Sequence, residues 1–162
     1  MAVNYFGTLY ALKTVLPAVR TRGSGRVILL SSGTGLFGFF GYSAYGATKL
    51  ALRGLAESLH AECRDSGVNI HIVYPPDTDT PQLAHENQTK PPETAAITAD
   101  GGLWTAEAVA KLILRQATAG RFSITPGLPL TLLAGLHSII APLLRWTFHR
   151  TARKARPSSR PR

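Results

Sequence analysis

The sequence predicts a parallel α/β fold, in which helices alternate with strands that are buried on both faces. Two runs of nearly continuous apolar residues, 26–30 and 68–74, are typical of strands inside a parallel sheet. Segments with apolar residues at helical spacing precede, separate and follow these runs. The resulting order of helix, strand, helix, strand, helix, strand predicts a sheet whose strands are joined by helical crossovers.

The elements follow from local signals. Glycine-containing stretches end the first two helices, and two prolines, Pro75 and Pro76, end the second strand. Thr105 is an expected N-cap, with Glu107 placed to favour the positive end of the helix dipole. The expected elements are a helix over 3–20, a strand over 26–30, a helix over 43–65, a strand over 68–74, a loop with one short helix over 77–103, a helix from Thr105 to Ala119 and a strand over 122–125.

Composition excludes several classes of protein. The chain of 162 residues has 44% hydrophobic residues, too many for a disordered chain. Its net charge of +9 comes mainly from seven basic residues between Arg145 and Arg162, a stretch without an acid. This placement argues against a nucleic-acid-binding domain, which needs its charge on a folded face. The one cysteine, Cys63, allows no internal disulfide, and Asp77 and Asp79 lack a third ligand, so no metal site is expected.

Three polar residues near the first strand carry the expected chemistry. Ser32 follows that strand, Tyr45 comes thirteen positions later, and Lys49 is four residues beyond Tyr45. Residues four apart share one helix face, so both side chains can enter the cleft at the carboxyl end of the sheet. A free tyrosine titrates near pH ~10. We expect the Lys49 ammonium to lower the pKa of Tyr45 and make it an acid suited to a carbonyl, and a serine hydroxyl to hold the carbonyl oxygen.

Ser32 and the stretch Tyr45-Gly46-Ala47-Thr48-Lys49 resemble the Ser/Tyr-xxx-Lys active site of the short-chain dehydrogenases/reductases. Asn4, 28 residues before Ser32, matches the asparagine of that family's tetrad. The stretch 75–80 lies where the family has Pro-Gly-x-x-x-Thr, with Pro76 in place of the usual glycine. The resemblance implies a partial Rossmann-like doubly wound sheet. It also implies catalytic roles for Asn4, Ser32, Tyr45 and Lys49, and nicotinamide-cofactor contacts for Tyr45, Lys49, Pro75, Thr78 and Thr80.

Within that family, residues 74–81 followed by 86–91 are similar to 3-ketodihydrosphingosine (3-dehydrosphinganine) reductases. The similarity implies reduction of a long-chain ketone, with NADPH rather than NADH as the hydride donor. Two alternatives stay open. One is a reductase of the same family that acts on another hydrophobic alcohol or ketone. The other is a fragment without catalytic activity.

No glycine-rich turn between a strand and a helix precedes Asn4, and we expect this chain to be the carboxyl-terminal half of such a reductase. Gly33-Thr34-Gly35-Leu36-Phe37-Gly38 fits the dinucleotide pattern G-x-G-x-x-G. However, Phe39, Phe40 and Gly41 continue a loop where the pattern requires a helix. We therefore interpret these glycines as a loop that passes close to substrate, and expect weak NADPH binding by these 162 residues alone.

The end of the chain divides into a segment over 127–149 that is largely apolar and a basic, disordered tail over 150–162, after a reductase part over 1–126. The stretch from Leu130 to Leu144 is shorter than the ~20 apolar residues of a membrane-spanning helix. It fits a helix lying on a membrane surface beside a basic cluster. The alternative is a helix packed on the core. The expected partners are thus a hydrophobic small molecule, a membrane at its cytoplasmic face and a second copy of the chain.

Overall fold

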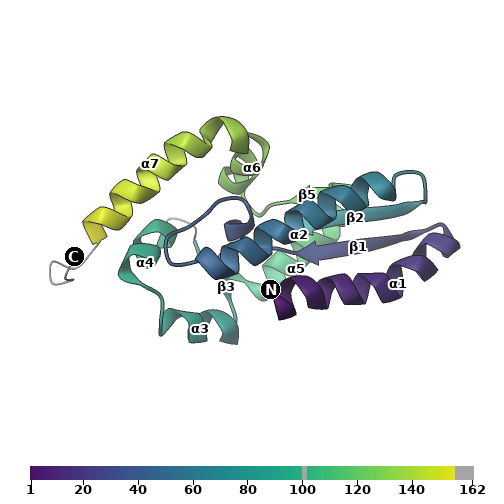
Figure 1. Ribbon diagram of the computed structural model, residues 1–162, viewed down its shortest axis with the longest axis horizontal. Helices are drawn as coiled ribbons and strands as arrows, with labels where there is room; N and C mark the ends of the chain where they lie inside the picture. Colours follow the sequence, from purple (N-terminus) through teal and green to yellow (C-terminus); the bar gives the residue numbers. More distant parts are fainter. Residues whose placement is uncertain (100–101, 156–162) are drawn as a thin grey trace.

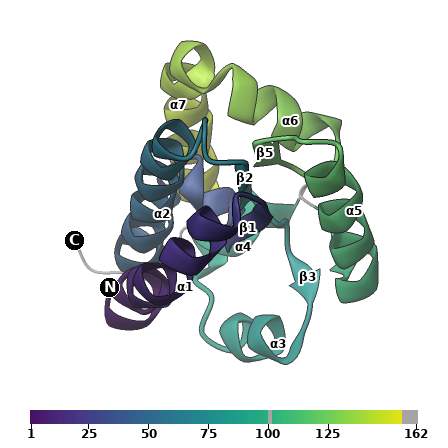
Figure 2. The ribbon, with the colours of Figure 1, turned by 90° about the vertical axis from the view of Figure 1, so that its right-hand side faces the viewer.

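The computed structural model describes residues 1–99 and 102–155, and its main sheet is parallel, as predicted. The strands are β1 (Gly25–Leu30), β2 (Val68–Val73) and β5 (Ser123–Ile124), in the order β1-β2-β5. Helices α1 (Thr8–Arg22) and α2 (Ser43–Glu62) lie on one side of this sheet, and α5 (Ala106–Thr118) lies on the other (Figures 1 and 2). The predicted doubly wound α/β fold is therefore confirmed.

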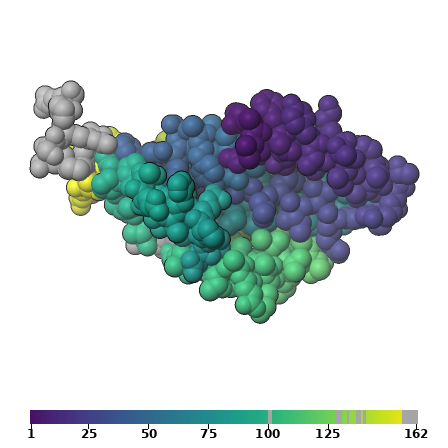
Figure 3. Space-filling view, turned by 90° about the horizontal axis from the view of Figure 1, so that it is seen from below, coloured from purple at the N-terminus to yellow at the C-terminus, as the bar shows by residue number. Residues whose placement is uncertain are grey.

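The core has two layers because neighbouring strand residues face opposite sides of the sheet. On the side of α1 and α2, Leu29, Ile70 and Ile72 pack in one cluster with Leu12 and Leu52. On the side of α5, the cluster consists of Val73, Ala117 and Ile124, with Ile28 and two residues of α5 packed against it. Figure 3 shows α1 along one flank of the molecule and α5 along the other.

Strand β1 lies at an edge of the sheet. It pairs with β2 over its whole length, with Val27 opposite Ile70 and Leu29 opposite Ile72. Among the residues that the structure describes, no strand pairs with its other side. The last residue of β1, Leu30, is 56% exposed. An open edge of this kind can pair with a further strand.

Local chemistry sets the turns. At Gly67, φ is 70°, and a Cβ atom would overlap the backbone carbonyl of Gly23, so glycine is required where the turns before β1 and β2 meet. The predicted N-cap of α5 is present: the Thr105 hydroxyl accepts a hydrogen bond from the Ala108 N–H at 3.2 Å. The helix predicted over 3–20 begins as a π-helix over Ala2–Gly7 that continues as α1.

The segment between β2 and α5 contains more structure than the one short helix expected. Thr80 caps α3 (Pro81–Asn87), and α4 (Pro92–Thr98) follows it. Both helices start with proline, whose fixed φ suits a first helical position and whose lack of an N–H separates one helix from the next. The two-residue strands β3 (Thr78–Asp79) and β4 (Trp104–Thr105) pair in parallel beside them.

The carboxyl-terminal segment differs from the prediction of one segment over 127–149 and a disordered tail from residue 150. It forms two helices, α6 (Leu128–Gly135) and α7 (His137–Ala155), separated at Leu136. Gly135 disfavours an unbroken helix there. Residues 150–155 are helical, because this stretch is rich in alanine and basic residues, which favour helix. The rest of the predicted tail, 156–162, lies outside the described residues.

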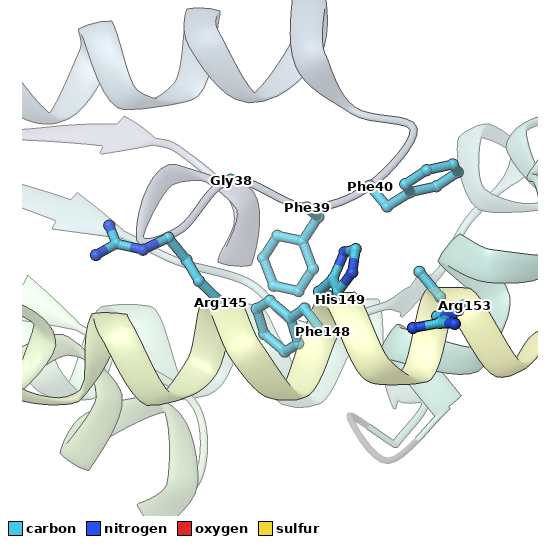
Figure 4. A pocket seen from close by; sticks show the side chains of 8 residues that line it. Gly38, Phe39, Phe40, Arg145, Phe148, His149 and Arg153 are labelled. Atoms are coloured by element: carbon cyan, nitrogen blue, oxygen red, sulfur yellow. The ribbon is translucent and has the colours of Figure 1, made fainter.

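Helix α7 has a packed side and an exposed side. On the packed side it contacts α4, and the Phe148 ring stacks on Phe39 of the loop after β1, with ring centroids 4.9 Å apart (Figure 4). On the other side Ile139, Leu143 and Trp146 are more than half exposed. No helix in the described part of the chain is both long and apolar enough to cross a membrane.

Candidate active site

A cleft of about 440 Å³ opens at the carboxyl ends of β1 and β2, where the sequence predicted a site. Its walls are the loop after β1, the start of α2, the segment from the end of β2 into α3, and one side of α5. Six of the seven predicted site residues line it, namely Ser32, Tyr45, Lys49, Pro75, Thr78 and Thr80. The fold thus brings together residues up to 48 positions apart in sequence.

The loop after β1 and the first turns of α2 place Ser32, Tyr45 and Lys49. Ser32 caps a short 3₁₀ turn, and its hydroxyl accepts a hydrogen bond from the Thr34 N–H at 3.3 Å. The same side chain is hydrogen-bonded to Tyr45. One helical turn after Tyr45, the Lys49 ammonium lies 5.5 Å from the centre of the Tyr45 ring and donates to the Leu30 carbonyl at 3.1 Å.

The pKa of Tyr45 is shifted in the direction opposite to the prediction. Burial raises the pKa of Tyr45, the hydrogen bond with Ser32 lowers it, and the Glu86 carboxylate raises it. Burial also lowers the pKa of Lys49. The expectation that Lys49 lowers the pKa of Tyr45 is therefore wrong for this structure. Loss of water around the phenol dominates, and the ammonium is directed at the Leu30 carbonyl.

Asn4 lies outside the cleft wall, against α2. Its side-chain amide donates to the Thr48 hydroxyl at 3.1 Å, and that hydroxyl donates to the Tyr45 carbonyl at 2.7 Å. Asn4 is thus linked to the backbone of Tyr45 by two hydrogen bonds. It is part of the π-helix Ala2–Gly7, a rare backbone form that is frequent at functional sites.

The segment after β2 forms the wall next to α3. The Pro75 carbonyl accepts a hydrogen bond from the Gly33 N–H at 3.2 Å, which ties this segment to the loop of Ser32. The Thr78 hydroxyl donates to the Pro76 carbonyl at 2.9 Å. The Thr80 hydroxyl donates to the Thr78 carbonyl at 3.2 Å while it caps α3. Pro76, at the position of the family's usual glycine, takes part in this turn through its carbonyl.

Four polar residues on the Tyr45 side of the cleft are not among the predicted site residues, namely Tyr42, Asp77, Glu86 and Lys90. The Tyr42 hydroxyl donates to the Glu86 carboxylate, and the Tyr42 and Tyr45 rings lie 5.8 Å apart. Lys90, with only 7% of its side chain exposed, lies 3.3 Å from Asp77 and 3.6 Å from Glu86. Burial, the hydrogen bond to Glu86 and its charge raise the pKa of Tyr42. Two sequence signals pointed to them: Asp77, Glu86 and Lys90 belong to the stretches 74–81 and 86–91, and Glu86 and Lys90 are spaced by four.

The glycine-rich stretch after β1 is not a dinucleotide fingerprint. Gly33–Gly35 form a 3₁₀ turn, and the chain continues as a loop until α2 begins at Ser43. A Cβ atom on Gly35 would overlap the Ser31 hydroxyl and lie 3.1 Å from the Lys49 carbonyl. Glycine is needed there because the loop crosses α2 at close range.

Fold and site together define a doubly wound α/β protein of the Rossmann type, with its polar cleft at the carboxyl ends of the strands. The short chain dehydrogenase family matches residues 1–91. The chain belongs to that family.

Two curated relatives have the same name, 3-ketodihydrosphingosine reductase. The chain is 43% identical over 143 residues to a 3-ketodihydrosphingosine reductase of Bos taurus, and 42% identical over 144 residues to one of Dictyostelium discoideum. Each match covers 88% of this chain and 43% of the relative. The chain therefore spans less than half the length of these curated relatives.

Solved structures have the same fold. A short chain dehydrogenase of Burkholderia cenocepacia J2315 in complex with NADP has a TM-score of 0.73 at 20% identity, covering 90% of this chain and 57% of that one. The structure of ElxO with NADP bound has a TM-score of 0.62 at 30% identity, and the match covers 76% of this chain and 54% of the ElxO chain.

Proposed function

We propose that residues 1–126 are the catalytic part of an NADPH-dependent reductase that converts 3-ketodihydrosphingosine to dihydrosphingosine. The observation that carries the proposal is the gathering of Ser32, Tyr45 and Lys49 in one cleft of a chain that is 43% identical to a bovine 3-ketodihydrosphingosine reductase. The length of the match, 143 residues or 88% of the chain, includes the residues that line the cleft and supports this substrate over other hydrophobic ketones.

The chemistry needs one hydride and one proton. Bound NADPH would supply the hydride to the ketone carbon. Tyr45 donates its phenolic proton to the carbonyl oxygen, and the C=O bond becomes CH–OH. Ser32 holds that oxygen by a hydrogen bond. Because its pKa is raised, the phenol of Tyr45 carries its proton at neutral pH, which is the form that a general acid needs.

The cleft fits the nicotinamide end of such a cofactor. Thr78, Thr80 and Pro75 line the wall that would receive the carboxamide, and Lys49, in the same cleft, would bind a ribose hydroxyl. The facing side of α5 contributes Val109 and Ile113, an apolar surface for a flat ring. Asn4, through Thr48, would hold the first turns of α2 in place and carry a water for proton return.

The test is reductase activity in a complete enzyme. Residues 1–162, joined behind the part of the bovine relative that precedes the matched region, should oxidise NADPH when 3-ketodihydrosphingosine is added. Tyr45→Phe should lower this rate by at least about 100-fold, since general acid catalysis is worth about that much. Tyr10→Phe, at an exposed position of α1, is the control. A fusion that reduces other long-chain ketones but not this one would refute the substrate assignment.

We further propose that α7 rests on an anionic membrane surface. Its exposed side carries Ile139, Leu143 and Trp146, and the Arg150 guanidinium lies 5.4 Å from the Trp146 ring. From Arg145 to the end the chain has seven basic residues and no acid. A large fraction of the protein should sediment with phosphatidylserine vesicles, and a smaller fraction with phosphatidylcholine vesicles. The double variant Leu143→Ser and Trp146→Ser should sediment less with phosphatidylserine vesicles than the unchanged protein. Unchanged sedimentation of that double variant would refute the assignment.

A second copy of the chain is the partner we propose for α1 and α2. An apolar groove of about 380 Å³ runs between them, lined by Leu9, Leu12, Leu16 and Leu55 among others. Sedimentation equilibrium decides between monomer and dimer, and Leu9→Glu should shift a dimer towards monomer.

A further inference from the structure

Glu86 is an acidic side chain in the wall of the proposed catalytic cleft. It reaches the cleft from α3, and its Oε1 atom accepts a hydrogen bond from the Tyr42 hydroxyl. About 30% of the side chain is exposed, and the side chain lines the cleft. The proposed reaction, in which Tyr45 gives the proton and Ser32 holds the oxygen, does not use it.

The charges around Glu86 do not cancel. Asp77 and Glu86 provide two carboxylates, and Lys90 provides one ammonium, 3.3 Å from Asp77 and 3.6 Å from Glu86. One net negative charge therefore remains at this wall. The other cation of the cleft, Lys49, is held at the end of β1 by the Leu30 carbonyl.

Of the two carboxylates, Glu86 is the one that acts on the reacting phenol. It is hydrogen-bonded to Tyr42, whose ring lies 5.8 Å from the ring of Tyr45, and its charge raises the pKa of Tyr45. A cation bound at Glu86 would lie on the side of the cleft where Tyr45 protonates the carbonyl group. Such a cation would also offset the effect of Glu86 and make the phenol a stronger acid.

The proposed substrate carries a cation in that position. In 3-ketodihydrosphingosine the carbon that bears the amino group is bonded directly to the ketone carbon. An enzyme that holds the ketone at Tyr45 therefore holds the ammonium next to it. A carboxylate is the natural partner of an ammonium, through a charge-assisted hydrogen bond.

Building on the proposed function, we propose that Glu86 binds the ammonium group of a 2-amino ketone, orients the ketone against Tyr45 and selects amino ketones over plain ketones. Lys90 and Tyr42 act as positioning residues that hold the carboxylate at the cleft wall.

The test compares two substrates in the fusion described above: 3-ketodihydrosphingosine and the same hydroxy ketone without its amino group. The quantity measured is the ratio of their kcat/KM values. The unchanged fusion should prefer the amino ketone by about 10- to 100-fold, the value of a hydrogen bond to a charged group. Glu86→Gln should bring the ratio to within about threefold of one, and Glu86→Asp should restore part of the preference.

Glu107→Gln is a matched control. It also removes a carboxylate from a Glu–Lys pair spaced by four on a helix, but this pair is 76% exposed and outside the cleft. The control should keep the full ratio. If Glu86→Gln lowers kcat/KM for both ketones equally, Glu86 has only a structural role and the inference is wrong. If the unchanged fusion reduces neither ketone, the proposed function itself fails.

A second readout works even where Glu86→Gln slows the reaction. Dihydrosphingosine carries the same ammonium and should inhibit the unchanged fusion more strongly than the corresponding diol without nitrogen. Glu86→Gln should remove that difference. Equal inhibition by the two compounds in the unchanged fusion would overturn the proposal.

Discussion

Replacing Gly35 by alanine should destabilise the fold, because the added methyl group meets atoms that cannot move freely. The new Cβ would overlap the Ser31 hydroxyl, which donates to the Lys49 carbonyl at 3.0 Å, and would lie 3.1 Å from that carbonyl. Ser31 can rotate away only by losing its hydrogen bond, which costs about 1 kcal/mol. The Lys49 carbonyl belongs to the backbone of α2, so the remaining overlap costs a further 1–3 kcal/mol or so.

The expected loss in the free energy of unfolding is thus about 2–4 kcal/mol. Urea unfolding of the 162-residue chain, followed by circular dichroism, should show the midpoint lowered by about 1–2 M at a slope of about 2 kcal/mol per M. Gly38→Ala is the matched control, because a Cβ there meets no atom within 4 Å. Equal midpoints for the two variants would show that Gly35 does not cross α2 closely.

Three further predictions concern stability, pH and cofactor binding. Gly54→Ala, in an exposed and open position of α2, should raise the free energy of unfolding by about 0.5–1 kcal/mol in the same urea experiment, and a decrease would contradict the helix. Burial raises the pKa of Tyr74 to about 12. The difference between this pKa and the value of ~10 in the unfolded chain makes the free energy of unfolding depend on pH. The contribution of Tyr74 is complete below pH ~10, and about 2–3 kcal/mol of it should be lost as the pH rises from there to the folded-state pKa. Tyr74→Phe should flatten this alkaline loss, and an unchanged pH profile would argue against burial of the phenol. Calorimetric titration of the 162-residue chain with NADPH should give weak binding, because its glycine-rich turn does not open onto a helix; micromolar affinity would overturn this expectation.

The sequence predicted what depends on local pattern. The strand pair 26–30 and 68–74 could be read from apolar runs, and the N-cap at Thr105 from its position before a helical pattern. Tyr45 and Lys49 could be placed in one cleft because helical spacing fixes their common face. These features need no knowledge of contacts between distant segments.

What the sequence did not predict depends on such contacts. Glu86 lies at the cleft only because α3 folds back beside Tyr42, 44 residues earlier in the chain. The raised pKa of Tyr45 reflects burial, which the spacing of Tyr45 and Lys49 does not specify. The break at Leu136 between α6 and α7 was missed because the apolar pattern continues through it.

Helices α7 and α4 pack against the loop that joins β1 to α2. Phe148, on its inner side, stacks on Phe39, and Thr94 of the neighbouring helix α4 donates a hydrogen bond to the Phe40 carbonyl at 2.7 Å. These contacts hold the loop that leads directly into the first turn of α2, where Tyr45 lies. The exposed side of the same helix carries Trp146. The helix proposed to rest on a membrane is therefore also the helix that supports the loop before Tyr45, the proposed catalytic tyrosine.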